Sequence, residues 1–276
     1  MTKLELGPIG VAVTPADGDV FLGAARELAE LGYATIWLSG GALKSLEQIR
    51  NVVSATRNVQ IGSGIISVDR FDRAAVAAAH ADIEAAHPGR LILGLGGAHG
   101  PRPLRTLAGY LDALDSVPPT VPAAARVLAA LGPRMLELAR DRAAGAYPFL
   151  VTPDYTARAR SLLGDDRALV VGQLVVLEND PEQARELARA PLRFLARLGG
   201  YAANLRRMGF AEDEITQLSD RLVDAVMAWG DLDAIAARVA EHLRAGADQV
   251  ALSVVSAGPP DSLPLEQWRQ LAKIRR

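Results

Sequence analysis

One unit recurs along this chain: a helix-like stretch that ends at or near a glycine, followed by a short apolar run. Four clear copies turn at Gly32, Gly89, Gly145 and Gly246. Glycine suits the end of a helix because it adopts the left-handed conformation without a Cβ clash. The runs are apolar almost throughout, which is typical of strands buried on both faces. The pattern predicts helices that alternate with buried strands.

Eight such runs are expected to be strands, at residues 8–14, 34–39, 59–66, 90–96, 126–131, 147–152, 168–177 and 249–255. Alternating strands and helices imply a parallel sheet with right-handed crossovers. Eight units in 276 residues fit a closed (β/α)8 TIM barrel, an α/β fold, better than an open sheet.

The stretch from about residue 180 to 247 is too long for one crossover. We expect an all-helical insertion there, between the seventh and eighth strands, with helices that begin at Asp180 and Asp231 because a short polar acceptor satisfies free backbone N–H groups. No linker is evident, so residues 1–276 are predicted to form a single domain.

The composition excludes several classes of function. A formal net charge of −2 gives no basic face for nucleic acid, and the absence of cysteine excludes disulfides and thiolate chemistry. No stretch approaches the roughly 20 apolar residues of a membrane span, and the N-terminus lacks a signal-peptide pattern. We therefore expect a cytoplasmic protein that acts on a small molecule.

The segment RLILGLGGAHG, residues 90–100, resembles a nucleotide-binding loop at first sight. A dinucleotide fingerprint needs G-x-G-x-x-G at a strand-to-helix turn. Counting from Gly94 gives Gly96 and then His99, so the third glycine is missing. The segment is better interpreted as the fourth barrel strand and its exit, where Gly96 and Gly97 let the backbone approach a flat ring.

In a barrel of this kind the active site lies at the carboxyl ends of the strands. Two of these ends lead directly into proline-started helices, at Gly132-Pro133-Arg134-Met135 and at Thr152. Helix starts offer free N–H groups and a positive dipole end, so both are candidate phosphate sites. The alternative is that both are ordinary helix caps.

His99, just beyond the fourth strand, is the candidate catalytic residue because an imidazole moves protons near neutral pH. The alternative is an exposed loop histidine. Trp37 and Ser39, at the end of the second strand, are the candidate substrate contacts, although Trp37 is equally expected as a core residue. His80, Glu84 and His87 share a helical face outside the barrel, where packing is favoured over a metal, so no metal site is predicted.

Four stretches resemble, in order, the bacterial luciferase-like superfamily: ELGYATIWLSG, ATRNVQIGSGIISVDRFDRAAVA, AAHPGRLILGLGGAHG and VLAALGPRMLELARDRAAGAYPFLVTPDYTARARSLLG. The last is similar to an actinobacterial-type subgroup usually assigned to the deazaflavin coenzyme F420. The resemblance implies a (β/α)8 barrel and a homodimer. It also implies a cofactor-phosphate loop at residues 132–135 and a bulge, often with a non-proline cis peptide, near Gly64-Ile65 against the flavin ring.

The sequence departs from the family where many members carry an acid or a histidine at the end of the first or second strand. These ends read VAVTPADGD and WLSGGALKS. The leading hypothesis is an oxidoreductase that transfers hydride between coenzyme F420 and a small organic substrate. An FMN-dependent monooxygenase or reductase is the first alternative, and a barrel without catalysis, serving as a binding or dimer-forming subunit, is the second.

Overall fold

The computed structural model describes residues 3–258 and 262–275, so the ends of the predicted domain, residues 1 and 276, lie outside the described residues. Its strands are β1 (Ile9–Val13), β2 (Thr35–Ser39), β3 (Gln60–Gly64), β4 (Ile66–Ser67), β5 (Leu91–Gly96), β6 (Arg126–Leu128), β7 (Gly145–Ala146), β8 (Ala168–Val176), β9 (Met227–Trp229) and β10 (Gln249–Val254).

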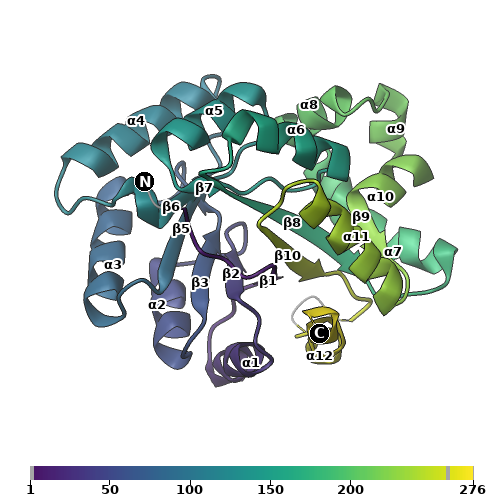
Figure 1. The fold of residues 1–276 in the computed structure, drawn as a ribbon, viewed down its shortest axis with the longest axis horizontal. Helices are drawn as coiled ribbons and strands as arrows, with labels where there is room; N and C mark the ends of the chain where they lie inside the picture. Colours follow the sequence, from purple (N-terminus) through teal and green to yellow (C-terminus); the bar gives the residue numbers. More distant parts are fainter. Residues whose placement is uncertain (1–2, 259–261, 276) are drawn as a thin grey trace.

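Parallel pairing closes these strands into a barrel. The order around it is β1, β2, β3 with β4, β5, β6, β7, β8 and β10, and β10 pairs with both β8 and β1. The predicted (β/α)8 fold is therefore confirmed, and β3 and β4 together occupy one of its eight strand positions. Figure 1 shows the strands at the centre and the helices around them.

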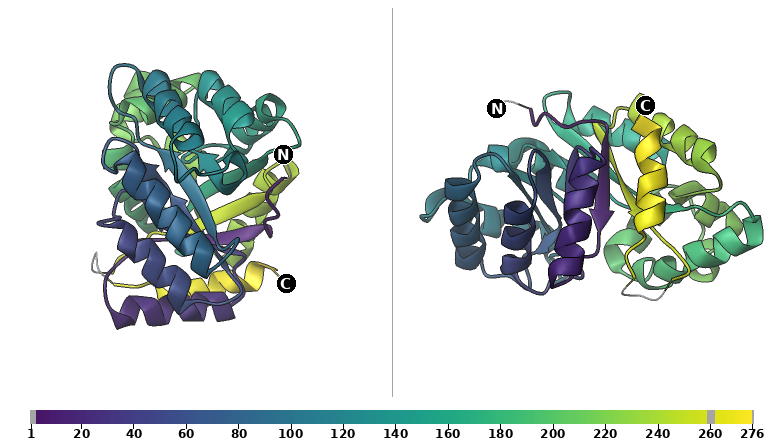
Figure 2. Two further views of the ribbon diagram at one scale, coloured as in Figure 1. Left: turned by 90° about the vertical axis from the view of Figure 1, so that its left-hand side faces the viewer. Right: turned by 90° about the horizontal axis from the view of Figure 1, so that it is seen from below.

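The helices follow the strands as the sequence pattern requires. They are α1 (Asp19–Glu30), α2 (Leu46–Ala55), α3 (Arg73–Ala86), α4 (Pro103–Ser116), α5 (Pro133–Arg142), α6 (Pro153–Leu163), α7 (Pro181–Leu195), α8 (Gly199–Arg207), α9 (Glu212–Gln217), α10 (Asp220–Val226), α11 (Leu232–Arg244) and α12 (Leu265–Leu271), with 3-10 turns at Ala123–Ala125 and Ala272–Arg275. Asp180 and Asp231 cap α7 and α11 with their side chains, as predicted. Figure 2 shows α12 beside α1, where Arg269 pairs with Glu27.

The barrel interior is filled with side chains, as expected of a TIM barrel rather than a pore. Its buried cluster consists of Ala12, Trp37, Ile92, Val127, Tyr147, Val170 and Ala251, with Leu4, Leu6 and Ile65 packed against it. A larger cluster lies between the strands and the surrounding helices. The helices α7 to α10 form a third cluster with the end of β8.

The predicted sixth strand, residues 147–152, was wrong in its position. The strand β7 is Gly145–Ala146, and beyond it only Phe149 makes a β-bridge, to Gly172. Gly145 was expected to close a helix in the left-handed conformation, as Gly32, Gly89 and Gly246 do. Gly145 instead lies in the strand, where a Cβ would come within 2.1 Å of the Ala168 carbonyl oxygen. Close strand packing, and not helix closure, explains this glycine.

The insertion between β8 and β10 is mostly helical, but the expectation of an all-helical insertion was wrong. The short strand β9 lies within it and pairs with residues 174–176 of β8. The reason is that β7 pairs only with Ala168 and Leu169, which leaves the later edge of β8 free for β9. Among the described residues, none of the helices combines the length and apolar character that a membrane crossing requires.

Candidate functional site

The third strand position of the barrel, formed by β3 and β4, contains a β-bulge. Gly62 pairs with Ile92 and Ile66 pairs with Leu95, so four steps along β3 and β4 correspond to three along β5. At the bulge the Ser63 hydroxyl takes the place of the backbone hydrogen bonds between the strands. Its Oγ accepts from the Gly94 N–H at 2.8 Å and donates to the Gly94 carbonyl oxygen at 3.0 Å. The extra residue bends the strand locally.

The peptide bond between Gly64 and Ile65, at this bulge, is cis. The backbone feature that the family resemblance implied at this position is therefore present. Gly40, just after β2, contacts this segment: the Gly40 N–H donates to the Gly64 carbonyl oxygen at 3.0 Å. A Cβ on Gly40 would lie 1.5 Å from the Ile65 carbonyl oxygen, so only glycine fits there.

The glycines of β5 have a structural role that the sequence did not indicate. A Cβ on Gly94 would lie 1.9 Å from the Ser63 carbonyl oxygen, and one on Gly96 would lie 2.6 Å from the Ala129 Cβ. Gly97 has a φ of +70° and packs against Ser67. These glycines leave room for the neighbouring strands to approach closely. Contact of Gly96 and Gly97 with a cofactor ring stays a prediction.

Trp37 and Tyr147 form a stacked pair inside the barrel. Their ring centroids are 4.7 Å apart with an interplanar angle of 29°. Trp37 is fully buried, and its indole N–H donates to Gln249 Oε1 at 2.8 Å. This position agrees with the core interpretation of Trp37, because Tyr147 covers one face of its ring. Ser39 lies at the end of β2 and is half-buried, so its role as a substrate contact stays a prediction.

His99 lies in the loop after β5, and its side chain is exposed. Its backbone N–H donates to Asp69 Oδ2 at 2.7 Å, which fixes the loop rather than the imidazole. The structure therefore places the predicted catalytic residue near the correct end of the barrel without enclosing it. A catalytic role for His99 stays a prediction.

The start of α5 faces an open pocket of about 440 Å³. Its lining combines the predicted phosphate loop with three further residues: Gly132, Pro133, Arg134 and Met135, with Pro103, Leu104 and Arg207. Gly132 is the N-cap of α5, and no side chain caps this helix. Uncapped helix starts bind anions because their N–H groups and the helix dipole point outward.

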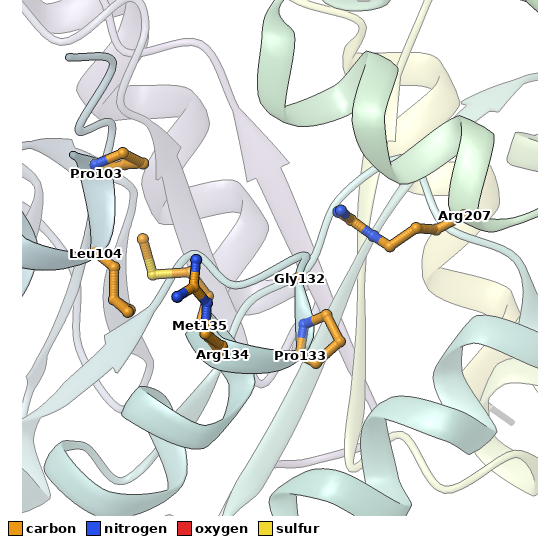
Figure 3. Close-up of a pocket in the computed structure, with 7 residues that line it drawn as sticks. All are labelled: Pro103, Leu104, Gly132, Pro133, Arg134, Met135 and Arg207. Carbon is orange, nitrogen blue, oxygen red and sulfur yellow. The ribbon is translucent and has the colours of Figure 1, made fainter. Parts of the chain in front are cut away.

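Arg207, at the end of α8 in the insertion, reaches this helix start. Figure 3 shows its side chain extending from the insertion toward Gly132, with Arg134 and Met135 on the other side of Pro133. The Arg207 Nη2 atom lies 3.6 Å from the position that a Cβ would take on Gly132. Arg207 donates to Asn204 Oδ1 at 3.3 Å, while Arg206 beside it is paired with Glu212. Arg134, Arg207 and the uncapped start of α5 thus line one pocket.

The second predicted phosphate site differs in one respect. Thr152 caps α6 with its own side chain, because its Oγ1 accepts from the Tyr155 N–H at 3.2 Å. The same hydroxyl contacts Met208 Sδ at 3.9 Å. These contacts fit the ordinary-cap interpretation of Thr152. A phosphate bound at the start of α6 would have to displace the Thr152 side chain from its hydrogen bond. A phosphate at the start of α5 would displace no cap, because no side chain caps that helix.

The candidate metal ligands do not converge. His80 is buried in α3, Glu84 accepts from the Gly89 N–H, and the His87 ring lies 3.3 Å from the Ser54 hydroxyl. Over residues 3–258 and 262–275, no group of three or more His, Asp or Glu side chains has an arrangement that could hold a metal ion.

Two residues of this region were missed by sequence reasoning. Arg207 belongs to no motif, and only the folding of α8 over the barrel brings it to Gly132. Tyr147 was placed at the start of the sixth strand, at the wrong end of the barrel. Because β7 ends at Ala146, Tyr147 instead follows the strand and lies at its carboxyl end. A strand assigned to Gly145–Ala146 would have placed Tyr147 directly after its carboxyl end.

Neither a family model nor a curated protein matches this sequence. Solved structures do match over almost the whole chain. One is the coenzyme F420-dependent tetrahydromethanopterin reductase from Methanopyrus kandleri, with a TM-score of 0.73, 17% identity, and 97% of each chain covered. Another is an F420-dependent secondary alcohol dehydrogenase in complex with an F420-acetone adduct, with a TM-score of 0.73, 13% identity, and 98% of each chain covered.

A third match is an oxygenating constituent of 3,6-diketocamphane monooxygenase from the CAM plasmid of Pseudomonas putida, in complex with FMN. Its TM-score is 0.66 at 13% identity, with 98% of this chain and 97% of that chain covered. The chain therefore has the TIM-barrel fold of these F420- and FMN-dependent oxidoreductases. At such identities the likeness establishes the fold, and fold alone does not determine function.

Proposed function

We propose that this protein is an oxidoreductase that uses coenzyme F420 and acts on a small organic substrate. The observation that carries the proposal is the anion pocket at the start of α5, where Gly132 leaves the helix uncapped and Arg207 approaches from the insertion. This pocket occupies the loop that the family resemblance assigns to the cofactor phosphate. The F420-dependent structures with the same fold support the choice of cofactor.

The residues present fit such a cofactor. Arg207 and Arg134 supply positive charge for a phosphate, and the absence of a side chain on Gly132 leaves room beside the backbone. The family resemblance places the flat ring against the β-bulge at Gly64–Ile65. A bound deazaflavin would supply the hydride chemistry, and the protein would supply position and electrostatics. Thr152, close to Met208 of the insertion, is the further phosphate contact in this proposal.

Titration of the purified protein with F420 and with FMN tests the cofactor. Deazaflavin fluorescence and flavin absorbance report the two bindings under the same buffer conditions. Tight binding of F420 with weak binding of FMN is the expected result. Tight binding of FMN alone would replace the proposal with the FMN-dependent alternative, which the FMN-bound structure of the same fold favours.

A barrel without catalysis is the second candidate function, and the exposed side chain of His99 favours it. This candidate predicts no binding of either cofactor at high micromolar concentration. We further propose a cytoplasmic, single-domain homodimer whose small-molecule substrate enters at the barrel mouth. Light scattering that reports a monomer would count against the dimer.

A further inference from the structure

A second pocket, of about 500 Å³, lies at the opposite end of the barrel from Gly132. Its lining includes Gln60 and Leu91, the first residues of β3 and β5, and Ala125, directly before β6. The pocket at the start of α5 instead follows β6. Because the strands run parallel, the two pockets belong to opposite ends of the barrel. We call the second one the amino-end pocket.

His80, on α3, lines the amino-end pocket with a ring whose nitrogens are unsatisfied. The residue is 3% exposed, and neither Nδ1 nor Nε2 has a hydrogen-bond partner among the described residues. The buried ring of His242, by contrast, contacts Thr156 through one nitrogen and Gln173 through the other. Buried polar groups normally have partners, so the His80 ring calls for one that a ligand can supply.

A second buried side chain with unsatisfied nitrogens faces the same layer of the fold. Val127 belongs to the cluster inside the barrel and Leu128 to the cluster under the helices, so strand alternation directs Arg126 outward as well. Arg126 Nη2 pairs with Asp115, while Nε and Nη1 have no partner in the described parts of the chain. Unsatisfied donors therefore predominate in the region around α3.

The polar lining of the amino-end pocket offers both a donor and an acceptor. His80 and Glu84 are one turn apart on the same face of α3, and both line the pocket. Burial lowers the pKa of His80, and the charge of Arg126 also lowers it, against the opposing charge of Glu84. A neutral imidazole carries one N–H donor. Glu84 Oε1 accepts from the Gly89 N–H at 2.9 Å, which leaves the carboxylate room for a second donor.

We infer that the amino-end pocket binds a small neutral molecule that has an apolar body and a primary amide. The amide carbonyl oxygen accepts from the His80 ring, and the amide N–H donates to Glu84. Leu4, Leu91 and Ile92 form apolar walls for the body of the ligand. The inference goes beyond the proposed function, because this pocket shares no lining residue with the one at the start of α5.

The charges around the pocket favour a neutral ligand over an ion. A carboxylate would meet Glu84 in the lining, while the nearby guanidinium of Arg126 is already paired with Asp115. An amidinium could pair with Glu84, but it has no acceptor for the His80 N–H. Each ion would leave a buried or partly buried group uncompensated, which costs more than a neutral amide does.

Three ligands of one shape test this inference without any turnover. Benzamide is neutral, benzoate is an anion and benzamidine is a cation. Chemical-shift titration of 15N-labelled protein gives the affinity for each of them. The chain has four histidines, and the ring signals of His80 are assigned by their loss in His80→Leu. We expect benzamide to bind most tightly and to shift the His80 ring nitrogens saturably.

His80→Leu keeps a side chain of similar size and removes both ring nitrogens. Benzamide affinity should fall about fivefold, the loss of one hydrogen bond. The unliganded variant should be as stable in urea as wild type or more stable, because an apolar group replaces buried polar atoms that have no partner. A purely structural histidine would show the opposite effect on stability.

Ala85→Leu tests the location of the ligand. Ala85 and Ala86 are both exposed near the end of α3, but Ala85 lines the pocket and Ala86 does not. Leucine at position 85 should therefore block benzamide, while Ala86→Leu should bind it normally. F420 affinity should be the same in both variants. Failure of F420 to bind while benzamide still binds would reject the proposed function and leave this inference intact.

Four results would overturn the inference. Benzamide could leave the His80 signals unchanged, or either ion could bind more tightly than benzamide. Equal benzamide affinity in Ala85→Leu and Ala86→Leu would place the ligand elsewhere. A large loss of stability in unliganded His80→Leu would show that the ring nitrogens already have partners in the folded protein.

Discussion

The Arg207 guanidinium lies against the uncapped helix start at Gly132, 3.6 Å from the position where a side chain would begin. The two residues are 75 positions apart and come from different parts of the fold, α8 of the insertion and the loop after β6. Their approach brings the insertion into the pocket at the start of α5, where we propose that Arg207 completes the phosphate site.

Arg207→Gln should weaken F420 binding by about tenfold, since a charged hydrogen bond contributes about 1.5 kcal/mol. The deazaflavin core that lacks the phosphate tail should bind equally to wild type and variant. Arg206→Gln is the matched control, because Arg206 pairs with Glu212 at the surface. Fluorescence titration measures the affinity of each of the three proteins for both ligands. An equal loss for the core and for the complete cofactor would show that Arg207 does not act through the phosphate.

Gly132→Asp separates stability from binding. The backbone at Gly132 has φ −88° and ψ 157°, which any residue adopts at a helix N-cap. An aspartate there caps α5, so the free energy of unfolding should stay the same or rise by the few tenths of a kcal/mol that a better cap gives. The same carboxylate occupies the anion site and pairs with Arg207, so F420 affinity should fall at least tenfold. Retained affinity would place the phosphate elsewhere.

Gly40→Ala should destabilise the protein by about 1–3 kcal/mol, the usual cost of overpacking. The added Cβ would lie 1.5 Å from the Ile65 carbonyl oxygen, so the backbone at the barrel mouth must move. The neighbouring Gly41→Ala meets nothing within 4 Å and is the control. Urea unfolding of both variants gives the comparison. Equal stability would mean that the Gly40 contact with Ile65 does not constrain the mouth.

Asp115→Asn should cost about 3 kcal/mol of stability, because it leaves a buried guanidinium without its counter-charge. The Arg126 side chain is fully buried and its hydrogen bond goes to Asp115. Burial alone would raise the pKa of Asp115, but hydrogen bonds and charges from Arg126 and Arg142 outweigh it and hold that pKa below its usual value.

A carboxylate whose pKa is lowered on folding stabilises the protein above its unfolded pKa, and this contribution is lost as the pH falls through the folded pKa. Wild-type protein should therefore lose more stability than Asp115→Asn between neutral pH and pH 3. The exposed pair of Arg140 and Asp141 provides the control substitution Asp141→Asn, which should change little. Parallel acid sensitivity of wild type and Asp115→Asn would contradict the prediction.

His242 predicts a second loss of stability, at milder acidity. The ring is buried between Thr156 and Gln173, with its nitrogens 2.9 Å from Thr156 Oγ1 and 3.1 Å from Gln173 Oε1. Burial, helped by the charge of Arg238, lowers the pKa of His242 to about 4. The unfolded chain therefore takes up this proton near pH 6.5, while the folded protein resists it.

Stability should consequently fall as the pH drops from about 6.5 to 4, by up to about 3 kcal/mol from this group. Urea unfolding at pH 7 and pH 5 should show a smaller difference for His242→Gln than for wild type. His99→Gln, at an exposed position, should keep the wild-type difference. An equal difference in all three proteins would show that His242 does not control this pH range.

The fold was predictable because continuous apolar runs mark strands buried on both faces, and most of these runs are strands of the barrel. The sixth strand was misplaced because β7 is only Gly145–Ala146, and a strand of two residues leaves no continuous apolar run in the sequence. The loop that lines the pocket at the start of α5 was predictable as a candidate site from a glycine before a proline-started helix. Arg207 was not, since its approach to Gly132 depends on the tertiary packing of α8, which no local pattern encodes.

Competition between the two cofactors tests the central claim most directly. Protein saturated with F420 is titrated with FMN, and the fraction of F420 released is followed by its fluorescence. A tenfold excess of FMN should leave most of the F420 bound. Complete displacement of F420 by equimolar FMN, or failure of F420 to bind at the outset, would contradict the account.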